Sequence, residues 1–128
     1  MIDLAVVVVS WNVCDLLRDC LRTCLDDIQR SGLQARITVV DSASTDGTAD
    51  MVRAEFHTVE LIVSDDNIGF VKGNNLALRR LGFGEPSWAV ERPRYVWLLN
   101  PDTRVQPGAI KTLVNFMAAA PRCGLCGP

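Results

Sequence analysis

Two hydrophobic patterns alternate along the chain, and together they predict four strands and four helices. Continuous apolar runs rich in β-branched and aromatic residues are typical of buried strands, whereas apolar residues spaced three and four apart are typical of amphipathic helices. The predicted strands span residues 4–10, 36–40, 58–64 and 95–99. The predicted helices span residues 13–28, 48–56, 70–81 and 107–121, with Asn12 as the N-cap of the first, and residues 82–94 are predicted to form a loop.

A helix follows each strand after a short connection, which predicts an α/β fold with parallel strands and helices on both faces of the sheet. The run Leu4–Ser10 contains four valines in succession, which favours the central position. We therefore expect a Rossmann-like three-layer sandwich with a mainly parallel sheet in the spatial order 3-2-1-4. Ligands bind such sheets at the carboxyl ends of the strands beside the switch point. Asp41 and Asp102 are expected to face each other there, across a crevice lined by the ends of strands 1, 2 and 4.

Polar clusters follow three of the predicted strands. Asp102 comes after the run YVWLL, which is typical of a strand covered on both faces and is ended by Pro101. The other clusters are DSASTDGT, which begins at Asp41, and DNIGFVKGNN, which begins at Asp66. Turn and capping chemistry is the alternative explanation for each cluster, and for Asp102 alone the two explanations are equally favoured. The convergence of all three clusters on one sheet edge favours a ligand site.

Composition narrows the class of protein. The chain has 128 residues, of which 48% are hydrophobic and 22% charged, as expected for one globular domain spanning residues 1–128. Its 13 basic and 15 acidic residues leave a net charge of −2, without the basic footprint of a nucleic-acid-binding protein. The first apolar run is too short for a membrane span or a signal sequence, so we expect a cytoplasmic protein.

The five cysteines are an odd number in a chain without an export signal, which favours reduced thiols. Cys20 and Cys24 lie on the apolar stripe of the first predicted helix and are expected in the core. Cys123 and Cys126 have the spacing of a zinc or redox motif. No second such pair and no nearby histidine accompany them, so a metal or redox role is disfavoured.

Four blocks, VVVVSWN, VVDSASTDGT, DNIGFVKGNN and WLLNPDTRVQPGAI, cover nearly the whole chain. Their order and spacing resemble the N-terminal half of family 2 glycosyltransferases with the GT-A fold, especially the rhamnosyltransferase-like members. The resemblance implies transfer of a sugar, with inversion, from a dTDP, UDP or GDP sugar to a saccharide or lipid-linked acceptor, with Mg²⁺ or Mn²⁺. It also implies that the full enzyme works in the cytoplasm or as a peripheral protein at the inner face of the membrane.

The resemblance assigns roles to individual residues. Asp102 matches the metal-binding aspartate, and Asn100 replaces the first carboxylate of the usual D-x-D pair, so that it is at most a weak oxygen ligand. Asp41 matches the residue that holds the nucleobase or ribose. The other matches are Ser10 and Asn12 on the nucleotide side, Ser44 and Asp46 in the second loop, and Gly69, Lys72, Gly73 and Asn75 in the donor pocket, with Lys72 as a phosphate partner.

The resemblance runs out at residues 124–128, where the family continues for about another domain's length of chain. The acceptor-binding part and the catalytic base are expected in that continuation, so no catalytic residue is assigned here. We therefore expect the chain to fold, to self-associate either edge to edge or by exchange of its C-terminal segment, and not to transfer sugar by itself. A nucleotide-sugar-binding module or gene fragment that never transfers is the alternative. A nucleotidyltransferase is disfavoured because Ser10-Trp11-Asn12 lacks the glycine and lysine of a phosphate loop.

Overall fold

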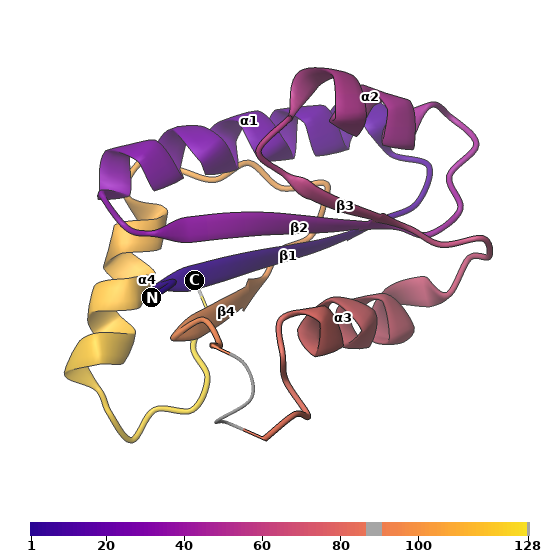
Figure 1. Ribbon diagram of the computed structural model, residues 1–128. Coiled ribbons are helices and arrows are strands. Elements are labelled where there is room, and N and C mark those ends of the chain that lie inside the picture. The colour runs from indigo at the N-terminus through magenta and orange to yellow at the C-terminus, as the bar shows by residue number, and fades with distance from the viewer. Residues whose placement is uncertain (87–90, 128) are drawn as a thin grey trace.

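The computed structural model describes residues 1–86 and 91–127, in which strands and helices alternate (Figure 1). In chain order the elements are β1 (Leu4–Ser10), α1 (Cys14–Ser31), β2 (Ala35–Asp41), α2 (Thr48–Glu55), β3 (Glu60–Val63), α3 (Gly69–Arg80), β4 (Tyr95–Leu98) and α4 (Ala109–Ala119). The predicted order of elements is confirmed, with ends that differ by a few residues. Residues 87–90 of the predicted loop 82–94 lie outside the described residues. Within the described ranges, no helix combines the length and apolar character needed to cross a membrane.

The sheet has the strand order β3-β2-β1-β4, and all of its strand pairs are parallel. The predicted order 3-2-1-4 is therefore confirmed, with β1 between β2 and β4. The register pairs Ser10 with Asp41 at the carboxyl ends of β1 and β2. These two polar side chains consequently leave the sheet side by side.

Helices cover both faces of the sheet, with α1 and α2 on one face and α3 on the other (Figure 1). Alternate residues of β1 explain this arrangement, because successive side chains of a strand point to opposite faces. Val6 and Val8 join the core cluster that includes α1 and α4, whereas Ala5 and Val7 join the cluster that includes α3. All four side chains are fully buried. The predicted three-layer sandwich is confirmed.

The strand β4 differs from the prediction. Its place at an edge of the described sheet agrees with the predicted order, but Tyr95, Val96 and Trp97 are only partly buried and Leu98 is 47% exposed. The interpretation of YVWLL as a strand covered on both faces is therefore wrong for this part of the chain. An apolar run indicates that a strand can be buried, but it does not indicate which elements cover it.

The helix α1 also differs from its predicted pattern at three positions. Leu16 belongs to the predicted apolar stripe but is 50% exposed, whereas Asp27 is a carboxylate that is only 2% exposed. The predicted N-cap, Asn12, is wrong, because Val13 occupies that position and makes no side-chain capping bond. The predicted burial of Cys20 and Cys24 is confirmed. The departures at Asn12 and Asp27 arise because their side chains accept hydrogen bonds from distant segments, at Thr45 and at Gly108.

Gly73 allows α3 to lie directly against the central strand. A β-carbon built at this position would come within 2.7 Å and 2.9 Å of the two γ-carbons of Val9. Valine is stiff at χ1, so rotation of this side chain would leave a γ-carbon in the way. Close packing of the α3 layer on β1 therefore requires glycine at position 73.

Replacing Gly73 with alanine is expected to lower the free energy of unfolding by about 1 kcal/mol or more, because overpacking outweighs the gain in helix propensity. Urea denaturation measures the change. Gly124→Ala is the control, since a β-carbon there meets nothing within 4 Å. In a double-mutant cycle, Val9→Ala should couple favourably with Gly73→Ala. Additive effects of the two substitutions would contradict this account of the contact.

Candidate functional site

The carboxyl ends of β1 and β2 carry two buried polar side chains with unused hydrogen-bonding capacity. Ser10 and Asp41 are each 1% exposed. The Asp41 Oδ2 atom accepts a hydrogen bond of 3.3 Å from the backbone N–H of Ser44. Among the described residues, Asp41 Oδ1 and Ser10 Oγ have no partner. A buried polar atom without a partner costs about 1–3 kcal/mol, so a ligand that supplied a donor here would gain that energy.

Hydrogen bonds between the loops after β1 and β2 tie these two segments together. The backbone N–H of Asn12 donates to Ser44 Oγ at 2.9 Å, and the backbone N–H of Thr45 donates to Asn12 Oδ1 at 2.8 Å. Asn12 (φ 51°) and Ala43 (φ 61°) both adopt left-handed backbone conformations, which are uncommon outside glycine. The side chains of Asn12 and Ser44 therefore hold the shape of the rim, and their predicted contact with the nucleotide stays a prediction.

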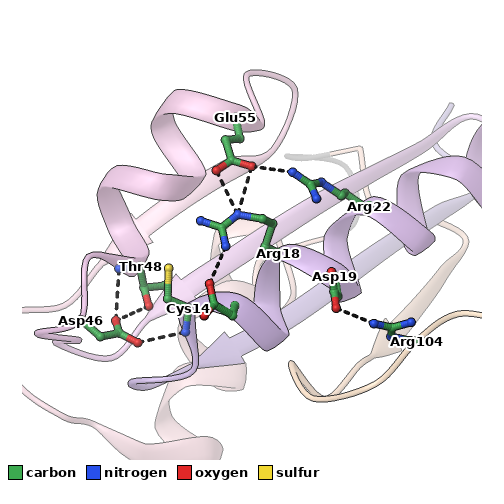
Figure 2. Close-up of polar contacts among 9 residues, drawn as sticks. Cys14, Arg18, Asp19, Arg22, Asp46, Thr48, Glu55 and Arg104 are labelled. Atoms are coloured by element: carbon green, nitrogen blue, oxygen red, sulfur yellow. Dashed lines mark hydrogen bonds and ion pairs between the residues drawn. The ribbon is translucent and has the colours of Figure 1, made fainter.

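The carboxylate of Asp46 joins the starts of two helices, as Figure 2 shows. It accepts hydrogen bonds from the backbone N–H of Cys14 at 2.9 Å and from the backbone N–H and the hydroxyl of Thr48 at 3.2 Å and 2.5 Å. Burial acts to raise the pKa of Asp46, but the hydrogen bonds from Thr48 and Cys14 outweigh it and lower the pKa below the ordinary value. The geometry of Asp46 thus corresponds to the capping alternative, because its oxygens already bind the amides of α1 and α2.

Ser42 is a residue of this site that sequence reasoning missed. Its hydroxyl oxygen accepts hydrogen bonds from the backbone N–H groups of Ile68 at 2.8 Å and Gly69 at 3.3 Å, and the hydroxyl donates to Asn67 Oδ1 at 3.0 Å. These contacts fix the start of α3 against the end of β2. The only signal in the sequence is a small hydroxyl residue directly after Asp41, and that signal does not distinguish Ser42 from Ser44.

The residues of the predicted donor-pocket block on α3 differ in their exposure to solvent. Lys72 and Asn75 are exposed, which leaves their polar groups available to a ligand. Gly69 has a φ of 74°, which favours glycine at this turn, and Gly73 is buried against Val9. Gly73 therefore has a packing role in the fold, and its proximity to a donor remains a prediction.

Asp102 lies in the loop after β4 with its carboxylate exposed. Asn100 is also exposed, and its backbone carbonyl accepts a hydrogen bond of 2.7 Å from the Thr103 hydroxyl. The described part of the chain has no group of three or more His, Cys, Asp or Glu side chains that could hold a metal ion. One exposed carboxylate fits a hard divalent cation whose remaining ligands are phosphate oxygens and water, as is common for Mg²⁺ sites.

A cavity of about 1010 Å³ lies beside this loop, between β4 and α4. Its lining includes Asn100 and Thr103 from the loop and the apolar side chains Leu98, Phe116 and Leu125. All three apolar side chains are exposed, with Leu125 at 89%. The free edge of the sheet is thus continuous with an apolar hollow on one flank of the Asp102 loop.

Comparison with known proteins identifies the family. The model of the family described as "Glycosyl transferase family 2" matches residues 5–128. The chain belongs to this family. An N-acetylglucosaminyl-diphospho-decaprenol L-rhamnosyltransferase of Mycobacterium tuberculosis is 31% identical over 97 residues, which are 72% of this chain and 30% of the relative. The resemblance to rhamnosyltransferase-like members of the family is therefore confirmed.

Two solved structures share the fold of this chain. The mannosyltransferase PcManGT of Pyrobaculum calidifontis, in complex with GDP-Man and Mn²⁺, aligns with a TM-score of 0.74 at 24% identity, over 91% of this chain and 32% of that protein. TarS of S. aureus (residues 1–349) in complex with UDP aligns with a TM-score of 0.71 at 21% identity, over 92% of this chain and 32% of that protein. This family 2 chain therefore has the GT-A fold and spans about a third of the length of these relatives.

Asp46→Ala is expected to lower the free energy of unfolding by about 1 kcal/mol at neutral pH, because the first amides of α1 and α2 lose their acceptor. Since folding lowers the pKa of Asp46, its contribution is complete above the ordinary carboxyl pKa of about 4 and is lost as the pH falls through the folded value. Urea unfolding is measured from about pH 7 to about pH 3. The difference in the free energy of unfolding between the variant and the unmodified chain should become smaller in acid.

The control for this experiment is Asp50→Ala. Asp50 is also an exposed carboxylate near the start of α2, but it pairs with Arg53 at 3.3 Å and caps no backbone amide among the described residues. It should change stability little at any pH. A stability difference for Asp46→Ala that stays constant across the pH range would contradict the assigned role of the ionised carboxylate.

Proposed function

We propose that this chain binds the nucleoside diphosphate sugar and the divalent cation of an inverting glycosyl transfer. The observation that carries the proposal is the pair of buried, unpartnered oxygens, Asp41 Oδ1 and Ser10 Oγ, side by side at the carboxyl ends of β1 and β2. The N–H or O–H groups of a nucleobase or ribose would satisfy both oxygens. Asp41 thus selects the nucleoside in this proposal, and Ser10 and Asn12 line the same end of the donor.

The diphosphate end of the donor is assigned to the neighbouring loops. Asp102 supplies one carboxylate to Mg²⁺ or Mn²⁺, with Asn100 beside it as at most a weak ligand. When bound, the cation would neutralise charge on the leaving diphosphate. Lys72 is exposed in the first turn of α3, where a cation and the helix amides favour phosphate oxygens. Gly69, Gly73, Asn75, Ser44 and Asp46 complete the donor side, the last two through the shape of the rim.

The acceptor is proposed to be a saccharide or a lipid-linked saccharide. The rhamnosyltransferase relative supports the second choice, because its name describes an acceptor carried on decaprenyl diphosphate. A lipid-linked acceptor requires the whole protein to reach a membrane surface, and we propose that it does so as a peripheral protein on the cytoplasmic side. The catalytic base is assigned to the two thirds of the relatives that this chain does not cover.

Isothermal titration with UDP, dTDP and GDP, with Mn²⁺ or with EDTA, tests the proposal. Asp102→Ala is expected to abolish the metal dependence of diphosphate binding and to leave nucleoside binding unchanged. Asp41→Ala is expected to weaken nucleoside and nucleotide binding alike by about tenfold or more, because a hydrogen bond to a charged group is worth about 1.5–3 kcal/mol. It should leave the metal dependence intact, since Asp41 lies on the nucleoside side.

Asp65→Ala provides the control, because Asp65 is an exposed carboxylate in the loop after β3 to which the proposal gives no role. It should bind like the unmodified chain. Equal affinity with Mn²⁺, with EDTA and in Asp102→Ala for every nucleotide would rule out the metal role. An Asp41 variant that lost Mn²⁺ affinity but kept nucleoside affinity would reverse the two assignments.

We further propose that the 128-residue chain self-associates, either edge to edge through β4 or by exchange of its C-terminal segment. Among the described residues β4 is paired on one side only, and its last residue, Leu98, is 47% exposed. Leu125 and the two nearby cysteines, Cys123 and Cys126, lie at or near the proposed contact. Light scattering should show dimers or larger species, and Leu98→Lys should shift the chain toward monomer. Leu16→Lys is a matched control at 50% exposure on α1. A clean monomer of the unmodified chain at high concentration would contradict the proposal.

A further inference from the structure

The loop that carries Asp102 is held by one stripe of the helix α1. Asp19, Thr23 and Asp27 are spaced four residues apart, so their side chains lie on one side of the helix in successive turns. Each of the three accepts a hydrogen bond from the segment between Asp102 and the first turn of α4. This stripe consists of polar residues beside the apolar positions of α1, and neither the fold prediction nor the proposed function used it.

The contacts downstream of Asp102 follow one another in order along both segments. The Arg104 guanidinium donates to Asp19 Oδ2 at 2.6 Å, an interaction visible in Figure 2. The backbone N–H of Val105 donates to Thr23 Oγ1 at 3.0 Å. The backbone N–H groups of Gly108 and Ile110 donate to the two carboxylate oxygens of Asp27 at 2.6 Å and 2.9 Å. The chain is therefore fixed from two residues after Asp102 to the start of α4.

The loop is also anchored upstream of Asp102. The backbone N–H of Leu99 donates to the carbonyl oxygen of Val7 at 2.9 Å, which continues the pairing of β4 with β1. The Cys20 thiol, also on α1, donates to the carbonyl oxygen of Asn100 at 3.6 Å. The exposed Asp102 carboxylate thus lies on a short arch with both ends attached.

An arch that is fixed at both ends places the backbone of Asp102 before a cation arrives, so that fewer positions are open to its carboxylate. A ligand that is held in place loses less conformational freedom on binding, and residues that orient a metal ligand typically change metal affinity about 10–100-fold. We propose that Asp19, Thr23 and Asp27 are positioning residues that set the affinity of the Asp102 carboxylate for the divalent cation. This inference rests on the proposed function, in which Asp102 holds the cation.

A purely structural role would be the competing explanation, because Asp27 also caps the first turn of α4. A structural role predicts a loss of stability without a selective loss of metal binding. A positioning role predicts a selective loss of Mn²⁺ affinity in a folded protein that still binds nucleoside. The two explanations therefore differ in the ratio of the Mn²⁺ affinity to the nucleoside affinity. This ratio is independent of how much of the protein is folded.

Thr23→Val is the decisive variant, because valine keeps the shape of threonine but leaves the Val105 N–H without its acceptor. Binding of Mn²⁺ in the presence of UDP, dTDP or GDP is followed through the paramagnetic resonance signal of free Mn²⁺, with Asp102→Ala as the baseline. Nucleoside affinity is measured by calorimetry on the same samples. We expect Thr23→Val to weaken Mn²⁺ binding about tenfold and to leave nucleoside affinity unchanged. Thr23→Ser, which keeps the hydroxyl, should restore Mn²⁺ binding.

Thr38→Val makes the same chemical change at a place remote from this loop. The Thr38 hydroxyl is fully buried and donates to Glu60 Oε2 at 3.1 Å, between β2 and β3. The Thr38→Val variant should leave Mn²⁺ affinity unchanged even where it lowers stability.

If Thr23→Val does not fold, Arg104→Met tests the same stripe at an exposed position. It should weaken Mn²⁺ binding about threefold, which is less than the effect expected at Thr23 because exposed ion pairs are weak.

The inference is overturned if folded Thr23→Val, or Arg104→Met in its place, binds Mn²⁺ as tightly as Thr38→Val does. It is also overturned if Thr23→Ser fails to restore the affinity. If the unmodified chain binds Mn²⁺ no better than Asp102→Ala, the proposed metal role itself is wrong and the inference is lost with it. Failure of the inference alone leaves the difference between the unmodified chain and Asp102→Ala in place.

Discussion

Hydrogen bonds from the first amides of the helices to side chains on other segments hold this fold in its shape. Asp46 accepts from the start of α1, Ser42 from the start of α3, and Asp27 from the start of α4. The N-cap residues of these three helices make no capping bond with their own side chains. Each helix start therefore takes its side-chain acceptor from a distant loop or helix, which couples the loops at the carboxyl edge of the sheet to the packing of the layers.

The hydrogen-bond partners of the carboxylates distinguish those with a structural role from the candidate ligand-binding ones. Asp46 and Asp27 use their oxygens on backbone amides. Asp41 keeps one oxygen without a partner in the described structure, and Asp102 presents its carboxylate to solvent. Four aspartates of one chain thus divide into two kinds by their partners, and residue type alone does not distinguish them.

The two candidate carboxylates lie in different environments, which suits the two ends of a nucleoside diphosphate sugar. In the proposed function the nucleoside end needs directional hydrogen bonds to a site protected from water, and Asp41 is buried. The diphosphate end needs a cation that keeps part of its water shell, which requires an exposed ligand such as Asp102. The attachment of the Asp102 loop to α1 and of the Asp41 loop to α3 connects both ends to the rigid layers of the sandwich.

Much of the fold was determined by features that the sequence shows locally. The valines of β1 and the spacing of apolar residues in α1 predicted the elements, their parallel order and the burial of Cys20 and Cys24, and the four blocks identified the family. The partial exposure of β4, the burial of Asp27 and the capping roles of Asp46 and Ser42 were decided only by the tertiary structure. Hydrophobic periodicity depends on neighbours a few residues apart, whereas the Cys14 amide that binds Asp46 and the Gly108 amide that binds Asp27 lie 32 and 81 residues away along the chain. A carboxylate that will cap such an amide and a carboxylate that will bind a ligand look the same until folding brings their partners to them.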